Sequence, residues 1–169
     1  MFLKNSNQMR KFAKFGIVLI AVLFVSTAFS FKQTQPEKSV LKWYDWNEGY
    51  PKAIKEGKIV LVDAYTDWCG WCKRMDRDTY SNQEVIEKIN KHFIPIKFNP
   101  EIKGVRYNLS DTTFSPEELY YLLTNGNSTG FPTTYFIFPK KMSLFYEPGY
   151  KDATSFLAIL NGAVAESEK

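Results

Sequence analysis

The sequence predicts an α/β protein in which helices cover both faces of a central mixed sheet. The run from Lys58 to Tyr65 is almost continuously apolar and β-branched, which is typical of a strand buried on both faces. Stretches with helix-start signals alternate with such runs along the chain, and this alternation is typical of an α/β sheet. The last two apolar runs, 133–138 and 144–150, are joined by a short turn, so an antiparallel hairpin should make the sheet mixed.

A β-α extension is expected ahead of this sheet. Residues Val40 to Trp46 form a short apolar and aromatic run that predicts a first strand. Asn47 can cap a helix that runs to about Glu56, and Gly57 can end it.

The middle of the chain predicts two helices and a strand. A helix should begin at the cysteine pair that follows Tyr65, and the capping-box pattern Ser81 to Glu84 should open a second helix to about Lys91. Residues 93–98 return to strand, where Pro95 fits only at the start of the strand or at an edge of the sheet. Residues 99–113 show no clear period and are expected to form a surface excursion.

The remaining helices have clear start signals. Ser115 is followed by Pro116 and two acids, which predicts a helix that ends near Asn125. Asp152 or Thr154 should cap a final helix to about residue 165.

The first thirty residues are typical of a secretory signal. Four basic residues precede a thirteen-residue apolar run from Gly16 to Ala28, and cleavage after Ser30 fits the small residues there. The apolar run is short for a membrane-spanning helix, although an uncleaved N-terminal anchor is the alternative. We therefore expect a signal at 1–30, a linker at 31–39 and one domain at 40–169, in the periplasm or secreted.

The charge of the chain belongs to this N-terminal segment. The sequence has 22 basic and 18 acidic residues, and residues 1–30 hold four of the basic ones and no acidic one. The rest of the chain therefore has no net positive charge to attract nucleic acid, and no nucleic-acid partner is expected. A membrane contact is expected only through the signal or anchor.

The only two cysteines, Cys69 and Cys72, have the spacing of an exchangeable dithiol. At the first turn of a helix, the unpaired N–H groups and the helix dipole would stabilise a thiolate on Cys69. Cys69 is thus expected to be the nucleophile, and Cys72, more buried and one turn further in, the resolving thiol. A purely structural disulfide is the alternative, but so short a loop would constrain the unfolded chain little.

The sequence predicts neither a metal site nor a cofactor. A structural zinc site needs four ligands, and His92 is the only histidine available to add to the two thiols. A Cu(I) site made from the cysteine pair alone remains conceivable. Lys73 stands where covalent haem attachment would need a histidine.

The segment Leu61 to Lys73 resembles the active-site segment of thioredoxins. Its Asp63 and Trp68 match residues of the thioredoxin motif, and the resemblance extends over about residues 40 to 166. It implies a thioredoxin fold, with a cis proline at Pro132 opposite the cysteines. The Gly70–Trp71 dipeptide departs from the Gly-Pro of thioredoxin itself, and residues 99–113 look longer than the family's connection.

The resemblance also implies roles for individual residues. Asp63 would be buried near Cys72 with a raised pKa and would exchange its proton, and Lys97 would pair with Asp63. A client protein would bind to the exposed surface around the cysteines and to the backbone beside the proline. The substrate-binding residues expected on this basis are Trp68, Gly70, Trp71, Phe131, Pro132 and Thr133.

A narrower resemblance links the chain to the C-terminal domain of transmembrane thiol:disulfide interchange proteins. Residues 68–75 and the stretch from Thr79 to Asn82 carry this resemblance. It implies a protein-disulfide reductase whose partners are disulfide-bearing client proteins and a separate membrane thiol–disulfide electron donor. Alternatives are a disulfide oxidase, an isomerase and a non-catalytic binding module on the same fold.

Overall fold

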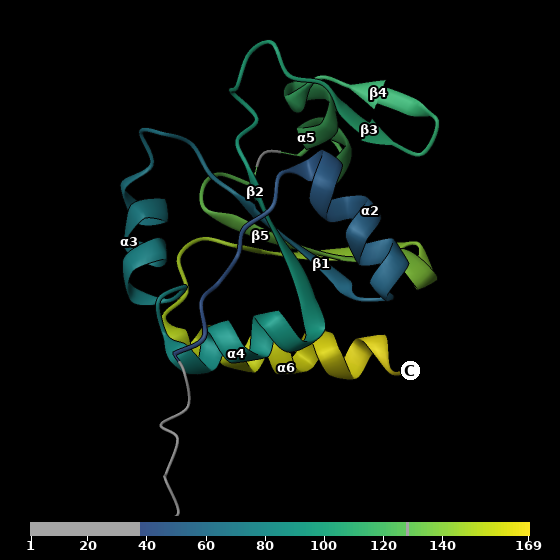
Figure 1. Cartoon of the computed structure of the whole chain (residues 1–169). Helices are drawn as coiled ribbons and strands as arrows, with labels where there is room; N and C mark the ends of the chain where they lie inside the picture. The colour runs from purple at the N-terminus through teal and green to yellow at the C-terminus, as the bar shows by residue number, and fades with distance from the viewer. Residues whose placement is uncertain (1–37, 128) are drawn as a thin grey trace, which may run out of the picture. The chain divides into compact units, whose positions relative to one another are not determined.

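A four-stranded mixed sheet with the strand order β2-β1-β5-β6 forms the centre of the structure (Figure 1). The computed structural model describes residues 38–127 and 129–169, so the signal expected at 1–30 and most of the linker lie outside the described residues. Strand β1 (Ile59–Ala64) pairs in parallel with β2 (Phe93–Phe98) and antiparallel with β5 (Thr133–Phe138), which pairs antiparallel with β6 (Ser143–Pro148). The predicted mixed α/β sheet is therefore confirmed.

The pleat of β1 directs alternate side chains into two separate cores. Val60 and Val62 pack with α2 (Trp46–Glu56) and α5 (Pro116–Thr124) on one face. Ile59 and Leu61 pack on the other face with three further helices. These are α3 (Gly70–Asp78), α4 (Gln83–His92) and α6 (Ala153–Ser167). All six β1 residues are buried, as expected of a strand with helices on both sides.

The predicted first strand is wrong in extent. Of the run from Val40 to Trp46, only Tyr44 pairs with the sheet, through an isolated parallel bridge to Ile96. Asp45 ends the run because its carboxylate accepts a hydrogen bond from the Glu48 N–H and caps α2, so the expected cap at Asn47 is also wrong. The N-terminal extension thus consists of a single bridge and one helix.

Most helix ends fit their start and stop signals, but the capping box predicted at Ser81 is wrong. Gly57 ends α2 in the left-handed conformation at φ 65°, which glycine adopts without steric cost. Asn82 caps α4, and not Ser81, because its side chain accepts from the N–H groups of Glu84 and Val85. The helix start predicted at Ser115 is confirmed in α5, where Ser115 and Glu118 also form a capping box, and Asp152 caps α6.

The excursion at 99–113 contains a small hairpin that the sequence did not predict. Strands β3 (Tyr107–Leu109) and β4 (Thr112–Phe114) form a separate two-stranded sheet. The side chain of Asn47 holds it against α2 by bonding to the Arg106 carbonyl and the Asn108 N–H, each at 2.8 Å. Three-residue strands are too short to show a reliable alternation of apolar and polar residues, so the sequence pattern does not reveal this hairpin. The contact with Asn47, which is distant in the sequence, anchors it.

Pro95 lies on the outer strand β2, in agreement with the predicted edge position. A short helix, Pro139–Lys141, joins β5 to β6 at the expected turn. Within residues 38–127 and 129–169, no helix has the length and apolar character needed to span a bilayer.

Candidate active site

The two cysteines form a disulfide at the start of α3. Cys69 is the N-cap of the helix, and its sulfur accepts a hydrogen bond from the Cys72 N–H at 3.0 Å. This places Cys69 at the positive end of the helix, as predicted. The two residues are 4% and 3% exposed, so burial does not distinguish them and the expectation of a more deeply buried Cys72 is not supported.

Trp68 forms an exposed wall beside Cys69. Its side chain is 68% exposed. The indole N–H donates to the carboxylate of Glu101 at 3.0 and 3.3 Å. The ring also lies nearly perpendicular to that of Phe131 at a centroid distance of 6.0 Å, and Tyr120 stacks on Phe131.

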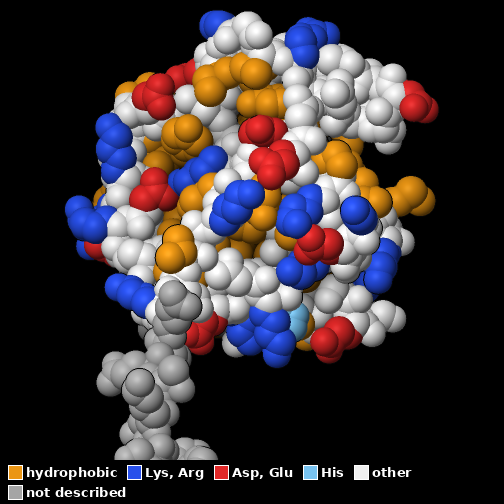
Figure 2. All heavy atoms as spheres, viewed as in Figure 1, with side chains coloured by type: hydrophobic (Ala, Val, Ile, Leu, Met, Phe, Trp, Pro, Cys, Tyr) orange, Lys and Arg blue, Asp and Glu red, His pale blue; other side chains and the backbone are white. Residues whose placement is uncertain are grey.

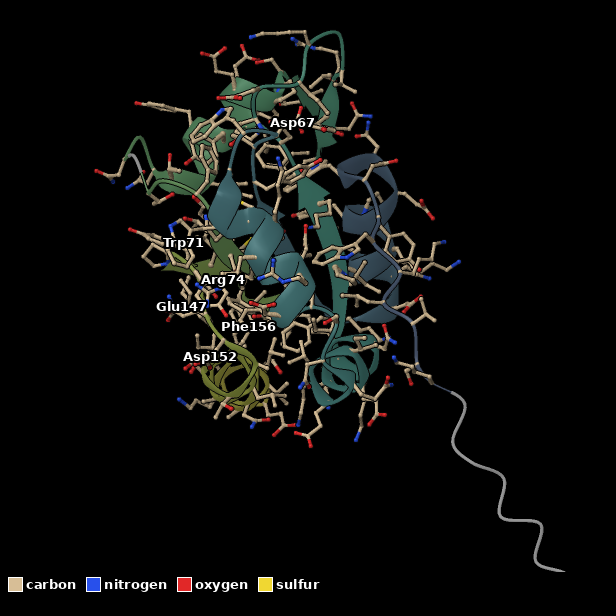
Figure 3. The ribbon with its side chains drawn as sticks, turned by 90° about the vertical axis from the view of Figure 1, so that its left-hand side faces the viewer. Asp67, Trp71, Arg74, Glu147, Asp152 and Phe156 are labelled. Atoms are coloured by element: carbon tan, nitrogen blue, oxygen red, sulfur yellow. A yellow bond between two sulfur atoms is a disulfide. The ribbon has the colours of Figure 1, made fainter. Side chains whose placement is uncertain are left out.

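Trp71 forms a second exposed wall on the opposite flank of α3. It is 55% exposed and lies 5.5 Å from the ring of Tyr150, measured between centroids. The guanidinium carbon of Arg74 is 5.1 Å from both ring centroids, and Asp78 holds the same guanidinium. Figure 3 shows Trp71 and Arg74 along this flank, with Asp67 near the N-terminal end of the helix.

The peptide bond between Phe131 and Pro132 is cis, as the resemblance implied. Thr133 follows it and pairs with Ala64 at the end of β1, which brings the proline loop next to the strand that leads into the cysteines. The Thr133 side chain is buried and donates to the Gly130 carbonyl at 2.9 Å. The Thr133 side chain therefore stabilises the loop.

Asp63 is the buried acid of the site. It lies on the same face of β1 as Leu61 and is 2% exposed. Its Oδ2 accepts a hydrogen bond from Lys97 at 2.6 Å, and its Oδ1 accepts one from the Tyr80 hydroxyl at 3.3 Å. Burial raises the pKa of Asp63 above its ordinary value, and the Lys97 ammonium opposes that rise.

Lys97 pairs with Asp63 as predicted, because the parallel register places the two residues directly opposite each other. Its ammonium also contacts the carboxylate of Asp76. Burial lowers the pKa of Lys97, but its contacts with the two carboxylates outweigh this effect, and the net pKa lies above the ordinary value.

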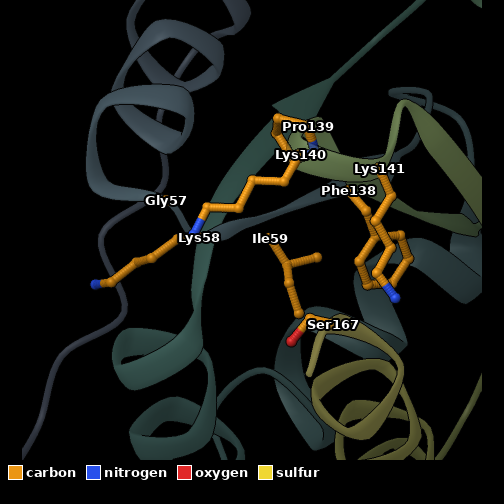
Figure 4. A pocket seen from close by; sticks show the side chains of 8 residues that line it. All are labelled: Gly57, Lys58, Ile59, Phe138, Pro139, Lys140, Lys141 and Ser167. Carbon is orange, nitrogen blue, oxygen red and sulfur yellow. The ribbon is translucent and has the colours of Figure 1, made fainter. Parts of the chain in front are cut away.

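The opposite end of the sheet contains a pocket of about 180 Å³ that does not resemble a site (Figure 4). Three lysines line it, but Lys58 and Lys141 bond to the backbone carbonyls of Asn90 and Glu166. Their ammonium groups therefore do not converge on one point. Among the described residues, no cluster of three or more His, Cys, Asp or Glu side chains is arranged to hold a metal ion.

The structure brings together most of the predicted site residues and adds five others. Gly70 is exposed in the first turn of α3, and the space beside its Cα is open. The additions were missed because each depends on a contact between distant segments. They are Arg74, Asp76, Tyr80, Glu101 and Tyr150.

A family model described as "Thioredox_DsbH: Protein of unknown function, DUF255" matches residues 25–161. The thiol:disulfide interchange protein DsbD of Tatumella citrea is 29% identical over 113 residues, which cover 66% of this chain and 17% of that protein. Spermatogenesis-associated protein 20 of Rattus norvegicus is 30% identical over 60 residues, which cover 35% of this chain and 8% of that protein. The matched segments are thus a small part of both relatives.

Two solved structures establish the fold. A thioredoxin from Thermus thermophilus superposes with a TM-score of 0.60 at 21% identity, covering 75% of this chain and 89% of the thioredoxin. A structure titled "DsbH Oxidoreductase" superposes with a TM-score of 0.58 at 16% identity, covering 83% of this chain and 96% of that one. The chain has the thioredoxin fold, with the Cys69–Cys72 disulfide at the start of α3.

Proposed function

The chain belongs to the Thioredox_DsbH family (DUF255), and from this premise we propose that it is a thiol–disulfide oxidoreductase that reduces disulfides of exported client proteins. The observation that carries the proposal is the position of the disulfide. It lies at a helix N-terminus next to two exposed indoles, and it follows the strand that carries a buried acid.

The reduced protein begins the reaction at Cys69. The helix N-terminus favours the Cys69 thiolate, which attacks one sulfur of a client disulfide. A bond forms between Cys69 and that sulfur, and the second client sulfur leaves as a thiolate and takes a proton from solvent. The product is a mixed disulfide between Cys69 and the client.

Cys72 then releases the client. Its thiol gives a proton to the Asp63 carboxylate, and the resulting thiolate attacks the sulfur of Cys69. The Cys69–Cys72 disulfide forms while the bond to the client breaks, and the client sulfur leaves as a thiolate and takes a proton from solvent. Two electrons have thus passed to the client. Lys97 holds the Asp63 carboxylate in place during this transfer.

The two exposed walls would bind the client. Trp68 with Phe131 on one side, and Trp71 on the other, offer apolar surface on both sides of Cys69. The backbone at Phe131 and Pro132 would pair with an extended client segment. Gly70 leaves the approach to Cys69 open, because no side chain lies between the two indoles at that position.

A separate dithiol protein would restore the reduced state. The proposed location is the periplasm or another exported compartment, and the proposed electron donor is a membrane thiol–disulfide protein. This direction of electron flow is supported by the sequence similarity to DsbD.

The equilibrium reduction potential tests the proposed direction. The full chain is equilibrated with glutathione buffers, and the fraction of Cys69–Cys72 disulfide is followed by alkylation and mass spectrometry. A potential near about −270 mV, that of thioredoxin, supports a reductase. A potential near about −120 mV would instead assign an oxidase, and one near about −180 mV an isomerase.

Trapping tests whether the cysteines act on clients at all. In the Cys72→Ser variant, the mixed disulfide cannot be released, so client proteins of an exported fraction should stay linked to Cys69. The Cys69→Ser/Cys72→Ser variant is the control. If Cys72→Ser links to no client, the chain is a non-catalytic binding module.

A further inference from the structure

Lys97 lies between two carboxylates that come from different elements. Its Nζ is 2.6 Å from Oδ2 of Asp63 on β1 and also contacts Oδ1 of Asp76 on α3. The side chains of Asp63, Lys97 and Asp76 are 2%, 21% and 46% exposed, so the three groups run from the core to the surface. Because α3 begins at the cysteines, the helix that carries the disulfide also carries the outer acid.

Three aromatic rings confine the Lys97 ammonium between these acids. Their centroids lie 4.7, 5.2 and 5.3 Å from Nζ in Trp43, Tyr65 and Tyr80, respectively. The rings limit the hydration of the ammonium, so its hydrogen bonds go mainly to the carboxylates. A hydrogen bond that Lys97 donates to one carboxylate therefore weakens its interaction with the other carboxylate.

The outer acid lines an open groove. Asp76, Tyr80 and Lys97 line it together with Trp43 and the chain from Lys38 to Leu41. Figure 2 shows apolar side chains among charged ones in the middle of this face, where residues 38–45, dark blue in Figure 1, run between α3 and α2. Water in the groove thus has access to Asp76, whereas Asp63 stays behind Lys97.

We infer that Asp76 is a positioning residue that competes with Asp63 for the Lys97 ammonium and so keeps the buried carboxyl able to take up a proton. This inference rests on the proposed function, in which Asp63 takes the proton of Cys72. If Lys97 bonded to Asp63 alone, it would hold that carboxylate in its charged form and make it a poorer base. Asp76 reduces this hold from the solvent side.

The sign of the effect follows from all the groups that face Asp63. Lys97 on β2 favours its charged form, as does the hydrogen bond from Tyr80, which follows α3. Asp76 on α3 disfavours the charged form directly, by like charge, and indirectly, by sharing Lys97. Tyr65 is the remaining titratable group against the Lys97 ammonium.

Two substitutions should therefore move the Asp63 titration in opposite directions. The ¹³C shift of the Asp63 carboxyl is followed against pH by NMR in the oxidised full chain. Asp76→Asn should lower the midpoint, because Lys97 then bonds to Asp63 alone. Lys97→Met should raise it, because Lys97 is the only cation paired with Asp63 within residues 38–127 and 129–169.

Asp78→Asn is the matched control. Asp78 lies on the same helix and pairs with Arg74 and Arg77, so its removal should leave the Asp63 midpoint unchanged. The inference is overturned if Asp76→Asn leaves the midpoint at the Asp78→Asn value or raises it. Asp76 is half exposed, so Asp76→Asn should fold, and its shift decides the matter even if Lys97→Met does not fold.

A kinetic readout separates this inference from the proposed function. In single turnovers with a client disulfide, the rate of the release step should fall at low pH, where Asp63 is protonated. The pH of this fall should be lower in Asp76→Asn and higher in Lys97→Met. Opposite NMR shifts without any client reduction would uphold the competition for Lys97 and reject the reductase. Client reduction with unchanged Asp63 midpoints would uphold the reductase and reject the competition for Lys97.

Discussion

The two sides of the Cys69–Cys72 disulfide reverse the usual distribution of side chains. Behind it, on the strand that leads to the cysteines, Asp63 is buried, and in the described part of the chain only Lys97 and Tyr80 bond to its carboxylate. In front of it, the indoles of Trp68 and Trp71 are more than half exposed. A stable fold prefers the opposite arrangement, with carboxylates outside and indoles inside.

The difference indicates that the two sides serve different steps. A buried acid with a raised pKa suits proton transfer and would act on any disulfide substrate, large or small. Exposed aromatic walls suit contact with a polypeptide and would matter little for a small disulfide. Substitutions behind the disulfide should therefore change a rate constant, and those in front should change client binding.

The largest effect is expected for Asp63→Asn. The amide cannot take the proton of Cys72, so release of the mixed disulfide should slow about a hundredfold. The slowing should be equal for a protein client and a small disulfide, measured in single turnovers. A loss confined to the protein client would remove the proposed division between the two sides.

The same substitution should change how stability depends on pH. Because the pKa of Asp63 is raised on folding, its contribution to stability is complete below the unfolded value of about 3.9 and is lost as pH rises through the folded pKa. Asp63→Asn should abolish this loss. The check is the free energy of unfolding of wild type and variant, measured in denaturant titrations from about pH 4 to about pH 9. As pH rises, the wild type should lose stability relative to the variant.

Trp68→Ala should have a smaller effect that depends on the substrate. Removing an exposed indole that packs against a client should raise KM for a protein client about tenfold, with a clearly smaller change for a small disulfide. Tyr121→Ala is the control, because Tyr121 on α5 is 66% exposed but lines a different pocket, together with Phe114 of β4. An equal rise in KM for both substrates would instead indicate that Trp68 acts in the thiol–disulfide exchange itself.

Arg74→Ala should have the smallest effect. Loss of the guanidinium between the rings of Trp71 and Tyr150 should free the Trp71 indole and raise KM for a protein client about threefold. Arg77→Ala is a close control, because Arg77 pairs with the same Asp78 and is 71% exposed at its side chain. If the two variants behave alike, the charge of the helix and not the stacking is responsible.

Local sequence patterns predicted the elements that local interactions determine. The strand at Phe93–Phe98 and the capped helix after Ser115 have the predicted bounds, because burial and capping leave direct patterns in the sequence. The cap of α2 was misplaced because Asp45 and Asn47 are both good caps. Only the bridge at Tyr44, which holds the preceding chain on β2, decides between them.

The site residues divide in the same way. The spacing of Cys69 and Cys72 is a local motif. The Asp63–Lys97 pair could be predicted because the resemblance to thioredoxins implied a lysine partner for Asp63. The contacts of Asp76 and Glu101 could not be predicted, since an exposed acid has no special pattern in a sequence. Their contacts with Lys97 and Trp68 exist only after separate elements have packed together.

The single bridge at Tyr44 has a consequence for where a working fragment of this chain can start. Tyr44 bonds on both sides of Ile96, through the Pro95 carbonyl and the Lys97 N–H, and so covers part of the outer edge of β2. A fragment beginning at Trp46 would keep every helix and strand described above. It would nevertheless expose a sheet edge open to intermolecular pairing and lose the Trp43 ring above Lys97.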